Sequence, residues 1–206
     1  MALSVHTIVN NPVSSNCHVL YDCTEKSAIL IDPGSEDCSQ IDSFLSIQRL
    51  KPEYVLLTHE HFDHCWGCNH YSELPVVCTS PCSDNIRSSQ SNLSFYFDNK
   101  GFAVKSDSMK VDIMDNSLIW HGNHVRFFPV KGHSPGGMLI TAGHFLFSGD
   151  TLIKDLKTVV KLKGGSRDEL LIDLSLIKSF VGNNYTVYAG HGDSFELDIY
   201  DMSKAL

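Results

Sequence analysis

The chain has 206 residues, of which 42% are hydrophobic, and a formal net charge of −8, so it is long enough to bury a sizeable core and too acidic overall for a general affinity for nucleic acid. No apolar run approaches the ~20 residues needed to cross a bilayer, and the N-terminus, interrupted by His6 and Asn10, lacks the basic start and apolar block of a secretory signal. We therefore expect a cytoplasmic protein that acts on a small molecule and binds neither nucleic acid nor membrane.

The first half of the chain predicts short strands that alternate with helices. Strands are expected at residues 18–22, 28–34, 54–58 and 75–79. Ser35 follows the Pro-Gly pair that ends the second run, and it predicts the N-cap of a helix with apolar residues along one side up to Leu50. A polar segment from 81 to about 92 predicts a further helix.

The second half predicts two hairpins, a helix and a last strand. Strands are expected at residues 117–120, 125–130, 137–141, 144–149 and 185–191. The tight turns are expected around Gly122-Asn123 and Ala142-Gly143, and leucines between Leu170 and Ile177 recur at helical spacing. No repeat or linker interrupts the pattern. The sequence therefore predicts one domain over residues 1–206, of the α/β class, with two mixed β-sheets and helices outside them.

Four potential metal ligands follow the strand at residues 54–58. His59 and His61 stand two apart at the strand end, so both side chains leave the same face. The turn that follows brings Asp63 and His64 towards them. Neutral imidazole and carboxylate groups suit zinc, iron or manganese. The stretch therefore predicts a site for one metal ion and the beginning of a second.

Three later candidates share a local pattern: an apolar strand, a glycine, and then the ligand. They are His133 in VKGHSPGG, Asp150 in LFSGDTL and His191 in VYAGHGD. Glycine allows the backbone to turn sharply, so the ligand projects from the strand end into a cleft. A purely structural interpretation would need three separate coincidences, and we predict that these side chains complete the metal site.

Together these pieces resemble the metallo-β-lactamase superfamily, and within it glyoxalase II, the hydroxyacylglutathione hydrolases, and their shorter relatives. The resemblance runs from NCHVLYD and LIDPG through THEHFDH, GHSPGG and FSGDT to VYAGHG. It implies the metallo-β-lactamase fold, a four-layer αβ/βα sandwich with the metals at one edge. It also implies that His59, His61 and His133 hold the first metal, that Asp63, His64 and His191 hold the second, and that Asp150 bridges the two.

The activity that the resemblance implies is hydrolysis, most favourably of a thioester, by a binuclear enzyme. Two divalent ions, zinc in the first place and iron or manganese as alternatives, would lower the pKa of a water molecule that they share. The resulting hydroxide would attack an acyl carbon while a metal stabilises the oxyanion. Asp63 would orient the nucleophile or shuttle its proton. No serine or cysteine nucleophile is required.

Other activities of the same fold remain open at this point. The aspartate at position 150 favours the thioesterase, lactonase and nuclease branches, since true metallo-β-lactamases commonly carry cysteine or serine there. The nuclease branch usually needs a more basic surface or an extra domain. A lactonase and a mononuclear-iron persulfide dioxygenase are therefore the alternatives, and a non-enzymatic metal-binding role is a third class. The oligomeric state is left open.

Substrate specificity is the least determined property. Full-length glyoxalase II enzymes have a helical C-terminal domain that helps to hold glutathione, whereas only residues 193–206 follow the last ligand candidate here. We therefore expect weak recognition of the glutathione part of a substrate. Phe95, Tyr96 and Phe97 are candidates for a substitute pocket wall, with core packing as the alternative interpretation.

Two further features have both a structural and a functional interpretation. The chain has seven cysteines, an odd number, and the expected compartment is reducing, so free thiols are expected. The alternative is a structural zinc on Cys65, Cys68, Cys78 and Cys82. Asp32, at a strand end, either hydrogen-bonds behind a metal-bound histidine or only fixes the turn.

Overall fold

The computed structural model describes residues 3–206, in which the strands form two six-stranded sheets. In spatial order, the first sheet contains β1 (Leu3–Val9), β2 (Asn16–Asp22), β3 (Ser27–Ile31), β4 (Lys51–Leu56), β5 (Val76–Cys78) and β6 (Ser108–Lys110). The second contains β12 (Phe195–Glu196), β11 (Thr186–Ala189), β10 (Phe145–Gly149), β9 (Met138–Ala142), β8 (Asn123–Pro129) and β7 (Asn116–Trp120). Both sheets are mixed, because β3 to β6 pair in parallel within the first and β10 with β11 within the second.

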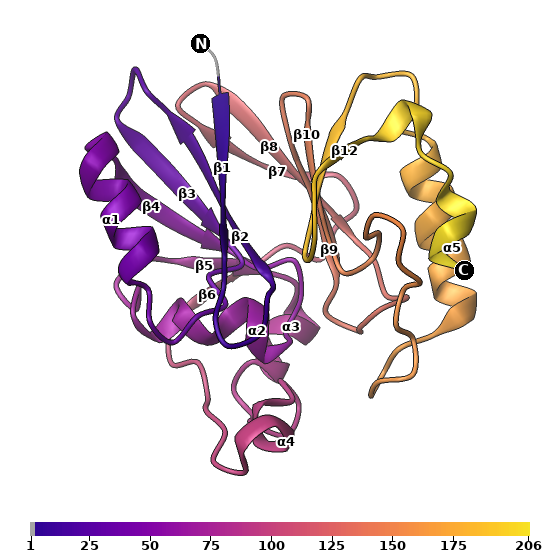
Figure 1. Cartoon of the computed structure of the whole chain (residues 1–206), viewed down its shortest axis with the longest axis horizontal. Helices are drawn as coiled ribbons and strands as arrows, with labels where there is room; N and C mark the ends of the chain where they lie inside the picture. Colours follow the sequence, from indigo (N-terminus) through magenta and orange to yellow (C-terminus); the bar gives the residue numbers. More distant parts are fainter. Residues whose placement is uncertain (1–2) are drawn as a thin grey trace.

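The helices are short and lie outside the sheets or at their edge. They are α1 (Ser39–Gln48), α2 (Phe62–Cys65), α3 (Ser80–Asn85), α4 (Ser94–Asp98) and α5 (Arg167–Lys178), with 3₁₀ turns at Trp66–Asn69, Leu197–Ile199 and Met202–Ala205. Figure 1 shows α1 on the outer side of the first sheet and α5 on the outer side of the second. Within residues 3–206, no helix combines the length and the apolar character that a bilayer span requires.

The hydrophobic core has three parts that define the layers. Between the sheets, Leu20 and Leu56 of the first lie in one cluster with Phe127 and Phe147 of the second. A second cluster joins the outer face of the first sheet to α1, and a third joins the outer face of the second sheet to α5. This arrangement confirms the four-layer sandwich of two mixed sheets expected from the sequence.

Both predicted hairpins form, but each turn is displaced by one residue. Trp120 pairs with Asn123, so the first turn consists of His121 and Gly122, both with positive φ. In the second hairpin Ala142 pairs with Phe145, which leaves residues 143–144 as the turn. Two-residue hairpin loops of the primed types need positive φ, and glycine adopts it readily. The position of that glycine within the loop could not be read from the pattern alone.

The predicted helix starts and ends were less accurate. Ser35 does not cap α1, which begins at Ser39, because the Ser35 hydroxyl is used elsewhere: it donates to Asn10 Oδ1 (3.1 Å) and accepts from the Asn11 amide (2.8 Å). The helix expected from 81 to about 92 is α3, which ends at Asn85.

The cysteines are distributed between surface and core in a way that favours free thiols. Cys23 is exposed and the other six are buried without disulfides. Burial raises the pKa of Cys65 and Cys68 well above the usual value and that of Cys38 to about 12, whereas zinc binds the thiolate. In the described part of the chain, no group of three or more potential metal ligands contains a cysteine. The structure therefore gives no support to a structural zinc on these residues.

Thiol titration checks this conclusion. In the native reduced protein, one thiol, that of Cys23, should react quickly with a chromogenic disulfide reagent, and all seven should react after denaturation. The control is Cys23→Ser, which should abolish the fast phase. A further zinc ion that survives removal of the metals bound by histidine and aspartate would restore the structural-zinc hypothesis.

Candidate metal centre

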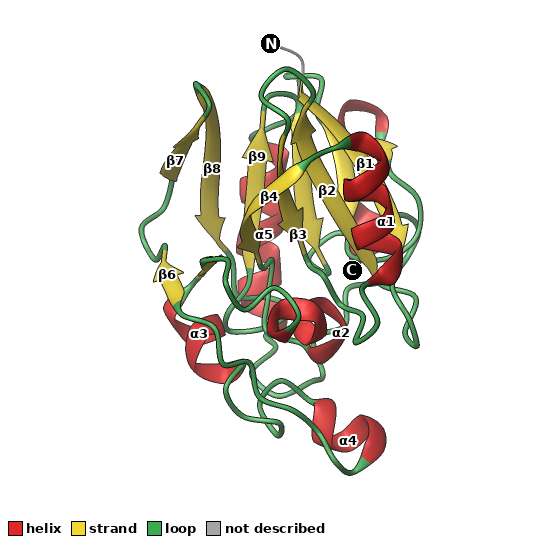
Figure 2. Ribbon diagram, turned by 90° about the vertical axis from the view of Figure 1, so that its left-hand side faces the viewer, coloured by secondary structure: helices red, strands yellow, loops and turns green. Residues whose placement is uncertain are grey.

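All seven predicted ligands lie at one edge of the two sheets, where strands from both halves of the fold end. His59, His61, Asp63 and His64 follow β4, and the last two belong to α2; His133 follows β8, Asp150 follows β10 and His191 follows β11. Figure 2 shows α2 at this end of the molecule, beyond the strand ends. The residues come together only because the two sheets pack face to face.

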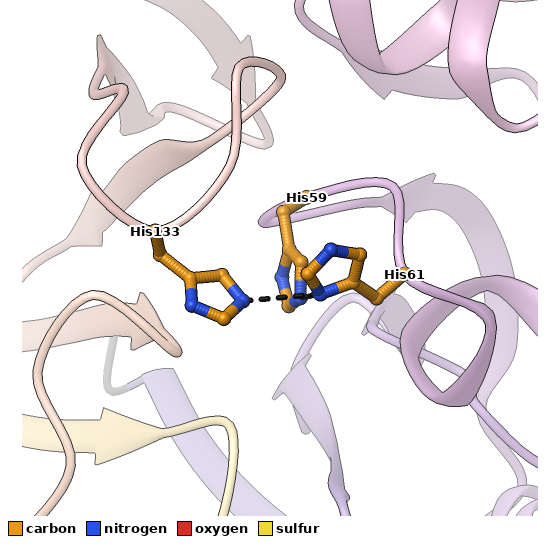
Figure 3. A group of neighbouring side chains, drawn as sticks. All are labelled: His59, His61 and His133. Atoms are coloured by element: carbon orange, nitrogen blue, oxygen red, sulfur yellow. Dashed lines mark hydrogen bonds between the residues drawn. The ribbon is translucent and has the colours of Figure 1, made fainter. Parts of the chain in front are cut away.

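Three histidines form the first group of ligands (Figure 3). His61 Nδ1 lies 3.1 Å from His59 Nε2 and 3.0 Å from His133 Nε2. All three side chains are buried. Burial and the neighbouring histidines hold the pKa of His59 well below its ordinary value, and burial followed by His133 lowers that of His61 to about 3. The rings of His59 and His61 are therefore neutral, the form that binds a metal, and three histidine ligands would leave a coordination position open.

Asp63, His64 and His191 form the second group. Asp63 Oδ2 lies 3.7 Å from His64 Nε2 and 3.4 Å from His191 Nε2. Burial opposes ionisation of Asp63, but the two histidines outweigh it and hold the pKa of the carboxyl well below its usual range. Burial lowers the pKa of His64, and the surrounding carboxylates, Asp63 first, outweigh it and raise that pKa to about 10. The carboxylates thus stabilise a positive charge beside His64 Nε2. A bound cation would supply this charge in place of the proton on that nitrogen.

Asp150 lies between the two groups. Its Oδ1 is 3.5 Å from His64 Nε2, and its Oδ2 is 3.8 Å from His133 Nε2 and 3.6 Å from His191 Nε2. The carboxylate therefore faces nitrogen atoms of both sets, as the bridging role implied by the sequence resemblance requires.

Two buried atoms show that the site fits metal ions. Among the residues that the structure describes, His64 Nε2 and Asp150 Oδ1 have no hydrogen-bond partner, and a buried polar group left unpaired costs about 1–3 kcal/mol. A cation between the two groups would satisfy both atoms. The close approach depends on Gly190, because a Cβ atom there would overlap Asp150 Oδ1. A donor set of imidazoles and carboxylates suits zinc or iron.

Asp32 makes the contacts that both interpretations require, one to a candidate ligand and two to the turn. Its Oδ2 accepts a hydrogen bond from His64 Nδ1 (3.0 Å) and one from the Thr58 hydroxyl (2.5 Å), while its Oδ1 accepts from the Thr58 amide (2.7 Å). With its proton on Nδ1, the His64 ring presents Nε2 to the site. The same carboxylate fixes the backbone that leads into the ligand loop.

Backbone carbonyl groups orient two further histidines. His133 Nδ1 donates to Val159 O (2.8 Å), and His191 Nδ1 donates to Ser14 O (2.9 Å). In both rings the Nε2 atom is therefore left to face the carboxylates of the site. These contacts also fix where the segments that contain Val159 and Ser14 lie relative to the metal centre.

Two buried carboxylates beside His133 were not foreseen from the sequence. Glu60 Oε2 accepts from the Ser134 hydroxyl (3.0 Å), and Asp173 Oδ2 accepts from the Gly132 amide (2.6 Å). The residues on both sides of His133 are thus held by carboxylates from other elements. The sequence could have indicated that Asp173 is buried, because it lies among the apolar residues of the helix at 167–178. No sequence pattern indicated a role for Glu60.

The aromatic residues at 95–97 lie in a lobe beside the ligand loop. Figure 2 shows α4 projecting beyond the rest of the molecule. The Phe97 ring lies 4.9 Å from that of Phe62, which directly precedes Asp63, and the Phe62 amide donates to Asn92 O (2.8 Å). Tyr96 is 70% exposed. The lobe is therefore connected to the metal centre through Phe62.

Metal analysis tests the number of ions. We expect the zinc-saturated protein to retain close to two ions per chain after desalting, because two ligand groups of three are present around one shared carboxylate. The measurement is elemental analysis against protein concentration. Asp63→Ala is the informative variant and should lose the second ion before the first. A saturated native protein with one ion would contradict the binuclear interpretation and favour the mononuclear dioxygenase.

The family follows from comparison with known proteins. The family model described as Metallo-beta-lactamase superfamily matches residues 10–191. The chain belongs to this superfamily. A curated relative is the "Probable polyketide biosynthesis zinc-dependent hydrolase PksB" of Bacillus subtilis (strain 168), 27% identical over 176 residues that cover 85% of this chain and 72% of the relative. BaeB of Bacillus velezensis, with the same description, is also 27% identical, with coverage of 86% and 73%.

Solved structures agree on the fold. The B3 metallo-beta-lactamase BLEG-1 superposes with a TM-score of 0.85 at 25% sequence identity, and the match covers 94% of each chain. TTHA1623 in a di-iron-bound form gives a TM-score of 0.73 at 24% identity, over 93% of this chain and 94% of the other. The superfamily expected from the sequence is confirmed, whereas the glyoxalase II-like subtype stays a prediction.

Proposed function

We propose that the protein is a binuclear metal-dependent hydrolase and that thioesters are its preferred substrates. The observation that carries the proposal is the position of the Asp150 carboxylate, whose oxygens lie 3.5–3.8 Å from nitrogen atoms of His64, His133 and His191, between two groups of three potential ligands. The description of the Bacillus subtilis relative as a zinc-dependent hydrolase supports the reaction type and zinc as the first metal to test.

The proposed assignment follows the distances in the site. The three histidines around His61 Nδ1 would hold the first ion, the three ligands around Asp63 Oδ2 would hold the second, and Asp150 would serve both. Two divalent ions in these places would lower the pKa of a shared water and polarise the carbonyl of the substrate.

The protein's own side chains would orient the attacking water. Asp63 is ionised and faces the site, so it can accept a hydrogen bond from the attacking water and orient it. The water oxygen forms a bond to the acyl carbon, the carbon–sulfur bond breaks, and the leaving thiolate takes up a proton. The products are a carboxylic acid and a thiol. Cys65 is excluded as a nucleophile, because it is buried and its pKa is raised.

The choice of thioesters over β-lactams rests on Asp150. The sequence resemblance associates aspartate at this position with thioesterase and lactonase activity, and cysteine or serine with β-lactamases. The likeness to BLEG-1 nevertheless makes a β-lactam a necessary comparison substrate.

One activity screen tests the proposal. Protein loaded with zinc, iron or manganese is assayed with a thioester, a lactone, a β-lactam and a phosphodiester, and oxygen uptake is followed with a glutathione persulfide. We expect thiol release from the thioester to be the fastest reaction. Exclusive hydrolysis of another substrate, or oxygen uptake by a single-iron protein, would overturn the thioester assignment.

A further inference from the structure

Residues 154–167, here called the basic segment, have a charge opposite to that of the whole chain. The segment contains Lys154, Lys157, Lys161, Lys163 and Arg167, and a single acidic residue, at position 155. The chain as a whole has 16 lysine and arginine residues and a net charge of −8. A large share of the positive charge is therefore concentrated in fourteen consecutive residues.

The backbone of the basic segment forms part of the metal centre. Val159 O accepts the hydrogen bond from His133 Nδ1 (2.8 Å), and the Ser166 amide donates to Gly132 O (2.8 Å). The segment also packs on the loop that follows His133, since a Cβ atom at Gly164 would lie 2.7 Å from Pro135 Cδ. Figure 1 shows it in orange, looping beyond the ends of the strands at the end of the molecule where α2 lies.

Three lysines of the basic segment are free to bind a ligand. Lys157, Lys161 and Lys163 are exposed, and none of them forms an ion pair with another residue of the 3–206 range, whereas Lys204 pairs with Asp155. Lys157 and Lys161 are each two residues from Val159, so at full extension their backbone is within about 7 Å of the contact with His133. The backbone of this part of the basic segment therefore lies beside the metal centre.

Apolar side chains alternate with these charges. Leu156, Val159 and Leu162 are all exposed. A ligand that matches both features has a long arm for apolar contact and several negative charges beyond it. A nucleic acid fits less well, because its binding needs a broad basic surface and the rest of this chain is acidic. Glutathione, with two carboxylates and one ammonium group, has little net charge to match three lysines.

We propose that the basic segment recognises the phosphorylated part of a phosphopantetheine thioester, with the acyl–sulfur bond at the metal centre. The phosphates carry most of the negative charge of such a thiol and lie at the end of the arm remote from the sulfur. Recognition of this end places the thioester without a contact to the reacting atoms. The inference rests on the proposed hydrolase function and names its substrate class.

The test compares substrates that share one acyl group. Zinc-loaded protein is assayed with butyryl-pantetheine, butyryl-pantetheine 4′-phosphate and butyryl-coenzyme A. We expect kcat/KM for the coenzyme A ester to exceed that for the uncharged pantetheine ester at least about tenfold at low salt, mainly through KM, and the difference to shrink in concentrated salt as the charges are screened. If kcat/KM for the 4′-phosphate ester already equals that for the coenzyme A ester, the natural substrate is a carrier-bound arm. If only the coenzyme A ester has the raised kcat/KM, the natural substrate is a thioester of free coenzyme A.

Charge reversal provides the matched control. The triple variant Lys157→Glu, Lys161→Glu, Lys163→Glu should lose the preference while it hydrolyses butyryl-pantetheine at the native rate. A control variant with Lys26→Glu, Lys51→Glu and Lys178→Glu changes the same charge at exposed positions and should keep the preference. Equal kcat/KM for the charged and uncharged esters in the native protein, or loss of the preference in both variants, would overturn the inference and leave the hydrolase proposal intact.

A binding measurement separates the two proposals. Desulfo-coenzyme A lacks the thiol that would itself bind a metal, so the part of its binding, followed by calorimetry, that the triple variant loses reports on the basic segment. Binding that the triple variant loses, together with no hydrolysis of any ester, would refute the hydrolase and support the recognition. Absence of binding in the native protein would refute the recognition.

Discussion

Asp150→Ala is expected to lower kcat/KM for the best substrate at least about a thousandfold, worth ~4 kcal/mol of transition-state stabilisation, and to weaken binding at both metal positions. The reason is its place between the two ligand groups, 3.5–3.8 Å from nitrogen atoms of His64, His133 and His191. The measurements are steady-state kinetics and metal content after dialysis.

The fold of this variant should persist. Within the described residues Asp150 Oδ1 has no hydrogen-bond partner, so truncation breaks no hydrogen bond of that atom, and the melting temperature of the metal-free protein should change little. Asp107→Ala, which changes an exposed aspartate outside both the metal centre and the basic segment, is the control and should leave both activity and metal content unchanged. Near-normal turnover in Asp150→Ala would show that the bridging assignment is wrong.

Asp32→Asn is expected to weaken binding of the second metal ion by about 10–100-fold, the usual effect of losing the partner behind a ligating histidine. The carboxylate now accepts the proton of His64 Nδ1. An amide nitrogen in its place would donate instead, so the ring would take the other tautomer, with its proton on Nε2, the atom that faces the site. Competition with a chromophoric chelator measures the change for each ion.

Asp22→Asn is the matched control for this variant. Asp22 is also a buried aspartate at a strand end, and its Oδ1 accepts from the backbone amides of Thr24 and Glu25, outside the metal centre. This substitution should leave both metal affinities unchanged. Equal losses in the two variants would mean that Asp32 acts only through general stability.

The convergence of these side chains at one edge was predictable because four of the seven follow a local pattern. A buried strand followed by a glycine or a tight turn places the next polar residue at a sheet edge, and His59, His133, Asp150 and His191 all fit that pattern. Packing of the sheets then brings these edges together. Asp32 also lies at a strand end, but its hydrogen bond with His64 is known only from the structure.

The features that the sequence did not predict depend on contacts between distant segments. Glu60 is one position from two ligands, but its role depends on Ser134, which belongs to the other half of the fold. Ser35 resembles a helix cap, but its hydroxyl donates a hydrogen bond to Asn10, in the loop after β1. In both cases the side chain has several possible partners nearby, and tertiary packing decides between them.

The ligand candidates come from both halves of the chain, and this bears on when a metal ion can bind during synthesis of the protein. A nascent chain that has reached β8 carries His59 and His61 but has no third histidine to complete the first group, and the second group stays incomplete until His191 is added, next to its bridge partner Ser15 near the N-terminus. Because the side chains of both groups come together only in the folded domain, we expect metal ions to be incorporated after His191 has been translated. A bound ion would then link side chains from both halves of the domain.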